Sequence, residues 1–230
     1  MGETQQLTHK VLTVTAFILL LAAFGLMLTS IRVKSATVDE DAYIGKGSAI
    51  WMAGNYNLET SHPPLGAMIN SLPLLLEPEL SPPKDHRCWP DGTARSCGRE
   101  MLFHRSNTRR VLFLARLPTI FLTLVLASLV GRWSGELFGP RAALVSVALC
   151  ALDPNMLANG RLVTPDVVTT LAIFANAYLF WRFWLRPSWG GLLAMGVALG
   201  VAGSTHFATG LLIPLVIVGS IVRTRHPLKR

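Results

Sequence analysis

An uncharged stretch near the N-terminus, Val11–Ile31, limits this chain more than any other feature of its sequence. The stretch has 21 residues, and a helix that rises about 1.5 Å per residue would cross a hydrocarbon core of roughly 30 Å. It is too long for the apolar part of a signal peptide, about 7–15 residues. Only 15% of the residues in the chain are charged, against about 25% in soluble domains. The sequence therefore excludes a soluble globular domain, a disordered chain and a coiled coil.

Further apolar segments predict an all-α polytopic membrane protein with a single transmembrane domain over 1–230. The predicted spans cover about 11–31, 111–130, 140–157, 163–181, 190–204 and 206–222, and a large outer loop covers 32–110. Ser204-Thr205-His206 interrupts the last apolar block, which favours two short helices there. Apolar residues at helical spacing behind Pro63-Pro64 predict an amphipathic helix over 64–76 that lies along the outer membrane surface.

The basic residues predict the orientation of these helices. The net charge is +8, and on the side of the N-terminus nine basic residues face two acidic ones. These residues are Lys10, Arg132, Arg141, Arg182, Arg186, Arg223, Arg225, Lys229 and Arg230, with Glu3 and Glu136. Because Lys and Arg gather in cytoplasmic loops, both termini are predicted to be cytoplasmic. The positive charge is thus a topology signal, and no nucleic-acid partner is expected.

Ionisable groups near the outer ends of the predicted helices form a candidate site. They are Asp39, Glu40, Arg116, Asp153, Arg161 and Asp166. Charged groups at membrane depth are costly and mark functional sites by default. A carboxylate can take a proton from a hydroxyl, and a guanidinium can bind a phosphate through two parallel hydrogen bonds. The residue types indicate a site that handles a proton and a phosphate at the lipid–water boundary, without specifying a reaction.

Three of these charged residues also have a structural explanation in terms of helix ends. Asp166 follows Thr164-Pro165 and fits the first turn of a helix, where an acid meets the helix dipole. Asp153-Pro154 fits a turn that ends a helix. Arg116 could extend its side chain to the membrane interface. Sequence alone leaves these explanations open beside the functional ones.

The remaining candidates have equally simple alternatives. Asp39-Glu40-Asp41 fits a solvated acidic cluster, His62 before two prolines fits a surface residue, and His206 fits a cap between two helices. Cys88 and Cys97 flank a polar stretch rich in turn formers, and a disulfide is expected if that stretch faces an oxidising compartment, with free thiols as the alternative. Three cysteines are too few for a disulfide scaffold.

Several motifs, taken in order along the chain, resemble a known family. They are Asp39-Glu40-Asp41-Ala42-Tyr43, Gly54-Asn55-Tyr56, His62-Pro63-Pro64-Leu65, Ala115-Arg116-Leu117-Pro118 and the segment Asp153–Asp166. With helices between them, these motifs resemble the lipid-carrier-dependent glycosyltransferases of the GT-C type. This group includes the protein O-mannosyltransferases (glycosyltransferase family 39) and bacterial relatives such as the aminoarabinose transferases of lipid A. The ordered set covers nearly the whole chain and is specific, whereas a lone Asp-Glu pair would not be.

The resemblance implies inverting transfer of a sugar from a polyprenyl-phosphate donor to a hydroxyl on protein, lipid or glycan. The expected location is the outer face of a bacterial plasma membrane, and the surface helix at 64–76 lies where a lipid donor would enter. Asp39 matches the general base, Glu40 a residue that orders the site, and Arg116 is expected to hold the carrier phosphate. The other residues expected to bind the donor phosphate or substrate are His62, Asp153, Arg161, Asp166 and His206. No cofactor, metal or nucleotide-binding loop is expected.

The chain departs from this family in two respects. It has Thr205-His206 where bacterial relatives often place Lys after a Ser, which leaves the role of His206 open. Family members carry several more helices, so we expect this chain to correspond to their N-terminal part. The alternative functions are a transporter-like membrane protein and a partner subunit of a complete transferase. A transporter would show corresponding broken helices in two halves, whereas this sequence has one break and no internal repeat.

Overall fold

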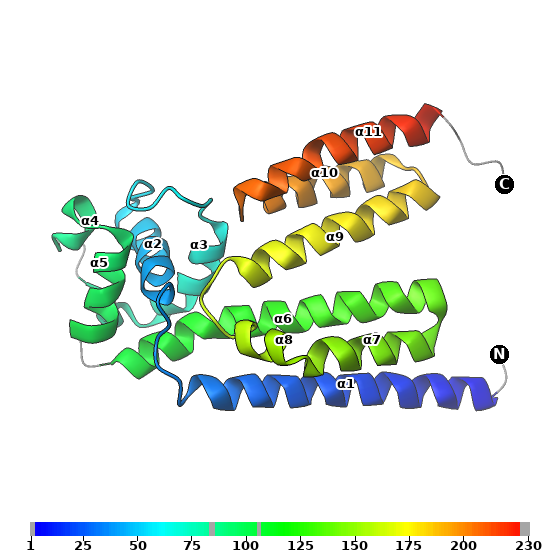
Figure 1. Cartoon of the computed structure of the whole chain (residues 1–230), viewed down its shortest axis with the longest axis horizontal. Helices are drawn as coiled ribbons and strands as arrows, with labels where there is room; N and C mark the ends of the chain where they lie inside the picture. Colours follow the sequence, from blue (N-terminus) through cyan, green and yellow to red (C-terminus); the bar gives the residue numbers. More distant parts are fainter. Residues whose placement is uncertain (1–2, 83–85, 105–106, 226–230) are drawn as a thin grey trace.

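The computed structural model describes residues 3–82, 86–104 and 107–225, and these form helices and no strand (Figure 1). The predicted all-α fold is confirmed. A bundle of long helices carries a layer of short helices at one end. The bundle consists of α1 (Glu3–Ile31), α6 (Thr108–Phe138), α7 (Pro140–Leu152), α9 (Asp166–Leu185), α10 (Trp189–Gly203) and α11 (Leu212–Arg225). The layer consists of α2 (Glu40–Ala53), α3 (Leu65–Ser71), α4 (Cys88–Asp91) and α5 (Ala94–Arg99).

Each predicted membrane span contains a helix of the bundle, and among the described residues three helices are long and apolar enough to cross a membrane. These are Gln6–Ile31, Thr108–Phe138 and Asp166–Leu185, while Pro140–Leu152, Trp189–Gly203 and Phe207–Arg223 are shorter. Large apolar side chains such as Phe17 and Leu21 of α1 lie exposed on the bundle surface, as expected where lipid is the solvent. These long apolar helices and the exposed apolar side chains are those of an integral membrane protein.

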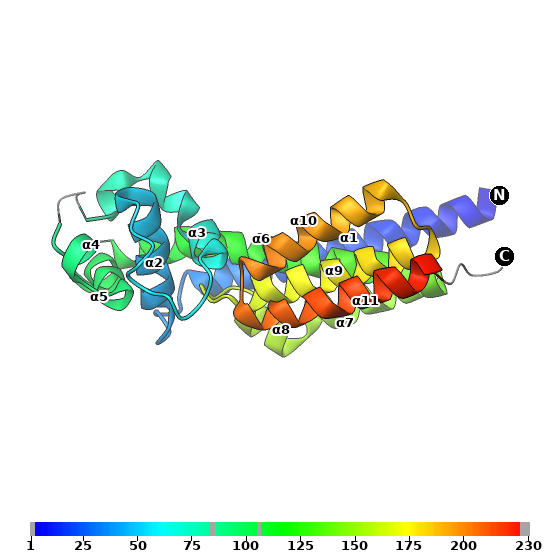
Figure 2. The same cartoon turned by 90° about the horizontal axis from the view of Figure 1, so that it is seen from above.

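The start of α1 and the end of α11 lie at the same end of the bundle, the end away from the short helices, on opposite sides of it (Figures 1 and 2). This arrangement fits an even number of crossings, as the charge distribution requires. Seven of the nine basic residues on the terminal side lie in described segments, whereas Lys229 and Arg230 lie outside the described residues. The cytoplasmic location of this end stays a prediction.

The third predicted span, 140–157, contains a helix break at Asp153, where the sequence predicted a turn that ends a helix. Helix α7 ends at Leu152, and a short helix, α8 (Pro154–Asn159), starts after it. Proline disfavours the helical conformation in the residue before it, and Asp153 is extended with φ −63° and ψ 127°. Helix α7 has 13 residues and is about 20 Å long, which is shorter than a full bilayer core.

The segment predicted as an outer loop, 32–110, is a packed helical layer rather than an open loop. Ile44 of α2, Trp89 of α4 and Cys97 of α5 are buried in one core with Val111 of α6. A Cβ atom on Gly98 of α5 would lie 1.7 Å from the backbone oxygen of Asp41, so only glycine allows the two helices to approach this closely. The layer therefore fixes the start of α2 against α5.

The predicted surface helix over 64–76 is present in two pieces. Helix α3 ends at Ser71, and a 3₁₀ turn (Leu72–Leu76) follows it because Pro73 cannot continue the α-helix. Small and polar residues, among them Gly66 and Ala67, face the protein, while Leu76 is 82% exposed. This inverted pattern is typical of a segment whose outer face meets lipid.

Cys88 and Cys97 are not joined by a disulfide. The Cys97 thiol donates to the backbone oxygen of Cys88 at 2.8 Å. Burial and the neighbouring Cys88 raise the pKa of the Cys97 thiol. The disulfide expected for an oxidising compartment is therefore not formed, although the two residues lie side by side.

Candidate active site

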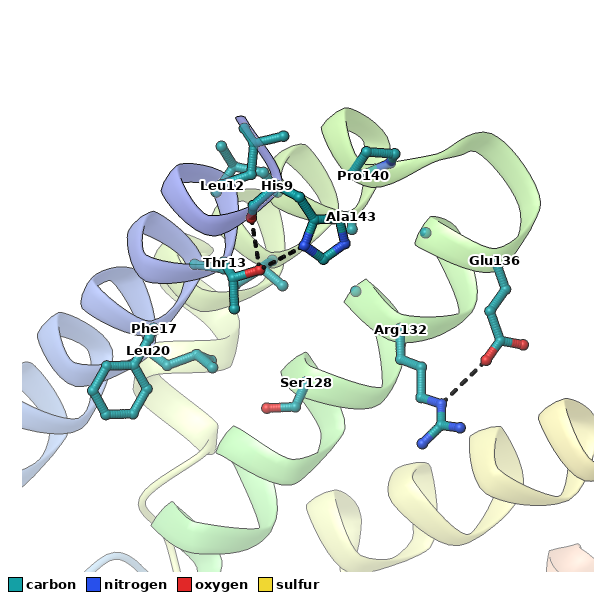
Figure 3. Close-up of a pocket in the computed structure, with 15 residues that line it drawn as sticks. His9, Leu12, Thr13, Phe17, Leu20, Ser128, Arg132, Glu136, Pro140 and Ala143 are labelled. Carbon is teal, nitrogen blue, oxygen red and sulfur yellow. Dashed lines mark hydrogen bonds and ion pairs between the residues drawn. The ribbon is translucent and has the colours of Figure 1, made fainter. Parts of the chain in front are cut away.

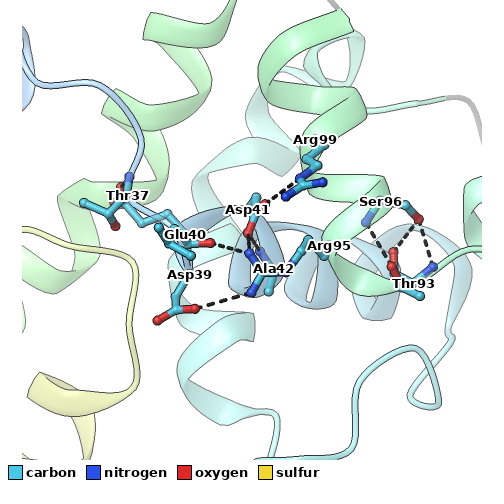
Figure 4. A network of polar contacts seen from close by, with 10 residues as sticks. Thr37, Asp39, Glu40, Asp41, Ala42, Thr93, Arg95, Ser96 and Arg99 are labelled. Atoms are coloured by element: carbon cyan, nitrogen blue, oxygen red, sulfur yellow. Dashed lines mark hydrogen bonds and ion pairs between the residues drawn. The ribbon is translucent and has the colours of Figure 1, made fainter.

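Three consecutive acidic residues at the start of α2 have three different environments (Figure 4). Asp39 is the residue before the first turn of α2, and its side chain is 65% exposed. Glu40 is completely buried, and the Asp41 side chain is only 7% exposed. The alternative of a solvated acidic cluster is therefore wrong for two of the three residues, and Asp39 is the most exposed of the three carboxylates.

Glu40 and Arg116 form a buried, two-pronged ion pair. Nε and Nη2 of Arg116 donate to the two Glu40 oxygens at 2.8 and 2.6 Å. Glu40 also accepts from the backbone N–H groups of Thr37 at 2.8 Å and Val163 at 3.0 Å. Burial alone would raise the pKa of Glu40, but the Arg116 guanidinium and the two N–H groups lower it below its usual value. The charged form of Glu40 is thus held in place.

The remaining donors of Arg116 bind the segment that leads into α2. Nη1 donates to the Lys34 carbonyl at 3.0 Å, and Nη2 also donates to the Ser35 carbonyl at 2.8 Å. The Arg116 side chain has no solvent exposure. We expected it to hold the carrier phosphate, but this geometry directs its hydrogen bonds to protein atoms. Arg116 instead joins α6 to the segment before α2 and, through Glu40, to the turn before α9.

Two arginines of α5 hold the other acidic neighbours. Arg95 pairs with Asp41 at 2.7 Å and with Asp39 at 3.4 Å, and it donates to the Val38 carbonyl. Arg99 pairs with Asp41 at 3.1 Å. Asp41 therefore ties α2 to α5, whereas the weaker Arg95 contact leaves most of the Asp39 carboxylate open to solvent.

His62 and His206 lie against each other, although 144 positions separate them in the sequence. Their ring centroids are 4.6 Å apart, and Tyr43 of α2 stacks on His62 with centroids 6.3 Å apart. The Leu65 N–H donates to the Ser204 carbonyl at 3.0 Å, which ties the start of α3 to the turn after α10. His206 also accepts from the Ala208 N–H through Nδ1 at 3.0 Å, so the predicted cap is present as well.

Three buried polar atoms without partners in the described structure belong to His62 and to the turn before α9. His62 Nδ1, Arg161 Nη1 and Thr164 Oγ1 form no hydrogen bond with the residues that the structure describes. A buried polar group without a partner costs about 1–3 kcal/mol, so such atoms are rare unless a ligand or water meets them. They lie three residues before α3 and in the turn before α9, and they are free to accept a hydrogen bond from a ligand or donate one to it.

The charges around His62 act on one another. Burial lowers the pKa of His62. The charges of His206 and Lys46 lower the same pKa further, whereas those of Glu59 and Asp166 raise it. Burial raises the pKa of Tyr43 to about 12, with smaller contributions from Asp39, Asp166 and Glu59. These mutual effects place Asp39, Tyr43, His62 and Asp166 around one region.

The structure separates Asp153 from this group, whereas Asp166 remains near it. Asp153 accepts from the Met156 N–H at 2.8 Å and caps α8, and no contact in the described part of the chain joins it to the other candidates. Asp166 is exposed in the first turn of α9, as the cap explanation predicts, and still lies near enough to influence His62. Arg161 lies near the Glu40–Arg116 pair: burial and the Arg116 charge lower the pKa of Arg161, and the Glu40 charge opposes them.

Lys46 is the residue that the sequence analysis missed. It is 3% exposed in the middle of α2, and Nζ donates to the His62 carbonyl. Burial lowers its pKa, and Glu59 opposes the effect. A lysine between Gly45 and Gly47 in an otherwise apolar stretch indicates a buried charge, but in a segment predicted to be a loop it indicates only solvent exposure.

A metal site would need several His, Cys, Asp or Glu side chains grouped together. Within the described segments, no three His, Cys, Asp or Glu side chains are grouped so that they could hold an ion. The polar groups described above are those that bind anions and move protons: histidines, a lysine, an arginine and an exposed carboxylate.

Comparison with known proteins adds one match. The model of a family described as dolichyl-phosphate-mannose-protein mannosyltransferase matches residues 105–230, which is slightly more than half of the chain. The matched part runs from α6 to the C-terminal end and includes Arg116, Arg161, Asp166 and His206. No curated protein and no solved structure matches the chain.

Proposed function

Because the chain belongs to the dolichyl-phosphate-mannose-protein mannosyltransferase family, a group of GT-C glycosyltransferases, we propose that it moves a sugar from a polyprenyl-phosphate donor to a hydroxyl acceptor. The single observation that carries the proposal is the exposed Asp39 carboxylate, whose charge acts on Tyr43, the residue that stacks on His62 of the His62–His206 pair. A base and a group of anion-binding side chains then face the same region, at the end of the bundle that meets the short-helix layer. The expected acceptors are hydroxyls of protein, lipid or glycan.

The reaction that this arrangement supports is an inverting displacement. Asp39 accepts the proton of the acceptor hydroxyl, whose oxygen attacks the anomeric carbon of the donor sugar. The bond from that carbon to the phosphate oxygen breaks, and its electron pair leaves with the polyprenyl phosphate. Fixed donors near the leaving phosphate stabilise the charge that develops on it.

We assign His62, His206, Arg161 and Thr164 to the phosphate. His62 Nδ1, Arg161 Nη1 and Thr164 Oγ1 are buried and lack partners in the described structure, so a phosphate oxygen would satisfy them. This assignment replaces Arg116, whose guanidinium already binds Glu40 and two backbone carbonyls. The part of Arg116 is to position the segment that carries Asp39.

The donor's hydrocarbon chain requires an apolar route to the site. Leu72 and Leu76, which follow α3, are 50% and 82% exposed, and Trp51 of α2 beside them donates to the Met68 carbonyl at 2.9 Å. These exposed apolar residues follow α3, and His62 lies three residues before it. We assign this apolar surface to the polyprenyl chain, at the outer face of a bacterial plasma membrane with both termini in the cytoplasm.

The test separates binding from transfer. The chain, in membranes or nanodiscs, is incubated with radiolabelled mannosyl-phosphoryl-polyprenol, and transfer to hydroxyl acceptors and retention of the donor are measured. Asp39→Asn should bind the donor normally and lose transfer by about 100-fold or more, as expected for a missing general base. Asp91→Asn removes an exposed carboxylate from the same layer and should leave both measurements unchanged. Full transfer by Asp39→Asn would reject the base assignment.

A further inference from the structure

Two cavities lie at the end of the bundle where both termini are found, and both are lined by Arg132 of α6. This end is opposite to the proposed active site (Figure 1). Neither cavity shares a residue with that site. The function of this end therefore has to be argued from its own residues.

The first cavity is an apolar groove of about 490 Å³ between α1 and α6, with α7 behind it. Figure 3 shows Phe17 and Leu20 of α1 on one side and Ser128 and Arg132 of α6 on the other. From His9 to Leu20 the groove follows α1 for about 17 Å at the helical rise per residue. This length suits much of a lipid acyl chain.

The second cavity is a basic pocket of about 430 Å³ between α6, α9 and the start of α10. Three arginines line it, Arg132, Arg182 and Arg186, and its lining includes no acidic residue. One carboxylate, that of Glu136, contacts two of them: Arg132 Nε lies at 3.1 Å and Arg182 Nη1 at 3.3 Å. Three guanidinium groups facing one carboxylate leave an excess of two positive charges.

Two of the three arginines of the basic pocket, Arg132 and Arg182, are held in position by neighbouring side chains. Tyr178 donates to Glu136 at 2.8 Å, and Arg182 donates to the Tyr178 hydroxyl at 3.0 Å. The guanidinium carbons of Arg132 and Arg182 both lie over the Tyr178 ring, 5.9 and 5.8 Å from its centroid. An anion that enters the pocket thus meets oriented donors and loses less free energy to their ordering.

A topology signal alone would not produce this arrangement. Arg141 lies at the same end of the bundle, at the start of α7, and lines neither cavity. Arg132, Arg182 and Arg186 converge on one pocket, and Arg132 connects that pocket to the apolar groove. A ligand with an anionic head and a hydrocarbon tail fits both cavities, and basic pockets between membrane helices bind such lipid headgroups.

We propose that this end of the bundle is a binding site for an anionic phospholipid. The phosphodiester group contacts Arg132, Arg182 and Arg186, and one acyl chain lies in the groove between α1 and α6. The site selects the lipid by charge, because phosphatidylcholine carries a compensating cation that three arginines repel. The inference rests on the residues of this end alone and stands independently of the transferase reaction.

The experiment measures lipid retention by the full chain. The protein is purified in detergent and examined by native mass spectrometry with added phosphatidylglycerol, with phosphatidylcholine of the same acyl chains, or with glycerol phosphate alone. Phosphatidylglycerol should be retained about tenfold more strongly than phosphatidylcholine, and glycerol phosphate should not be retained. Equal retention of the two lipids would overturn the proposal. Retention of glycerol phosphate as strong as that of the lipid would show a free-anion site instead and would overturn it too.

Matched variants locate the site. Each arginine near a membrane surface contributes about fivefold in affinity for anionic lipid, so Arg186→Gln should reduce the preference for phosphatidylglycerol by about that factor. Arg141→Gln removes the same charge at the same end and should leave the preference unchanged. Ala16→Phe fills the groove and should weaken retention of both lipids. An equal effect of the two arginine variants would reduce the site to a diffuse surface charge and overturn the proposal, and the unfolding temperature of each variant checks that it is folded.

Discussion

The Arg116 guanidinium of α6 grips both oxygens of the Glu40 carboxylate, and neither side chain is accessible to solvent. The pair connects three parts of the chain, because Arg116 also binds the Ser35 carbonyl and Glu40 also binds the Val163 N–H. Asp39 is the residue directly before Glu40. A fully buried ion pair therefore fixes the exposed carboxylate that we assign to the chemistry.

Removal of one partner of this pair should destabilise the protein strongly. Arg116→Ala leaves the Glu40 charge buried without its counter-ion, which costs about 3–5 kcal/mol in comparable cases. The free energy of unfolding in detergent measures the effect. Glu40→Gln combined with Arg116→Met should be less harmful than either single change, because it leaves no buried charge.

Arg110 provides the control for this prediction. It lies on the same helix and pairs with Glu77 through an exposed contact. Arg110→Ala should leave the free energy of unfolding unchanged within error, since exposed ion pairs contribute little. Equal losses from Arg110→Ala and Arg116→Ala would show that burial of the Glu40–Arg116 pair is energetically irrelevant.

The sequence identified Arg116 as unusual but did not reveal where its side chain points. A charge in an apolar helix fits a ligand site and a buried ion pair equally well. The choice depends on which face of α6 meets Glu40 and on the positions of the Lys34 and Ser35 carbonyls. These are set by the packing of segments far apart in the chain, which periodicity does not encode. The helical spans, by contrast, follow from local composition and were predictable.

The contact between α2 and α5 should tolerate no side chain at Gly98. A Cβ atom there would lie 1.7 Å from the Asp41 backbone oxygen, so Gly98→Ala must push α5 away from the acidic cluster. Overpacking of this kind costs about 1–3 kcal/mol, and transfer should fall together with stability. Thermal unfolding and limited proteolysis of the layer measure the effect.

Gly196→Ala is the matched control, because a Cβ atom there meets nothing within 4 Å. It lies inside α10, where alanine is the better helix former by about 1 kcal/mol. This variant should be at least as stable as the parent chain. A Gly98→Ala protein of unchanged stability would mean that the close approach of the two helices is not required.

The helical layer also shows why the site was only partly predictable. The resemblance placed Asp39, Glu40 and His62 in one region. In the structure Tyr43 stacks on His62, and Asp39 lies near enough for its charge to raise the pKa of Tyr43. Lys46 was not predicted as a site residue because residues 32–110 were predicted to form a polar loop. Their low hydrophobicity hides a core built from glycine contacts and a few large side chains, such as Trp89, and neither gives a periodic signal.

Protonation of His62 should link stability and ligand binding to pH. Its folded pKa lies below the ordinary value of 6.5, first because of burial and then because of His206 and Lys46. As pH falls below 6.5, the unfolded chain takes up a proton before the folded chain does, so stability is lost in that window. His62→Gln should reduce the drop in unfolding temperature between pH 7.5 and 5.5.

A phosphate bound at this site should reverse that dependence. An anion beside His62 favours its protonated form, so added polyprenyl phosphate should bind more tightly at pH 5.5 than at pH 7.5. Isothermal titration of the parent chain and of His62→Gln measures the change. Identical pH profiles for the two proteins would remove His62 from the phosphate site.

The Asp153 side chain should act as a helix cap and not as a substrate ligand. It accepts the Met156 N–H at 2.8 Å at the start of α8, and asparagine can make the same hydrogen bond, whereas alanine cannot. Both substitutions remove the negative charge. If the cap is its only part, Asp153→Asn keeps stability and transfer, and Asp153→Ala lowers the free energy of unfolding by about 1 kcal/mol. Thermal unfolding and the donor assay on the two variants decide the matter, because a substrate-binding charge would make both variants lose transfer to the same extent.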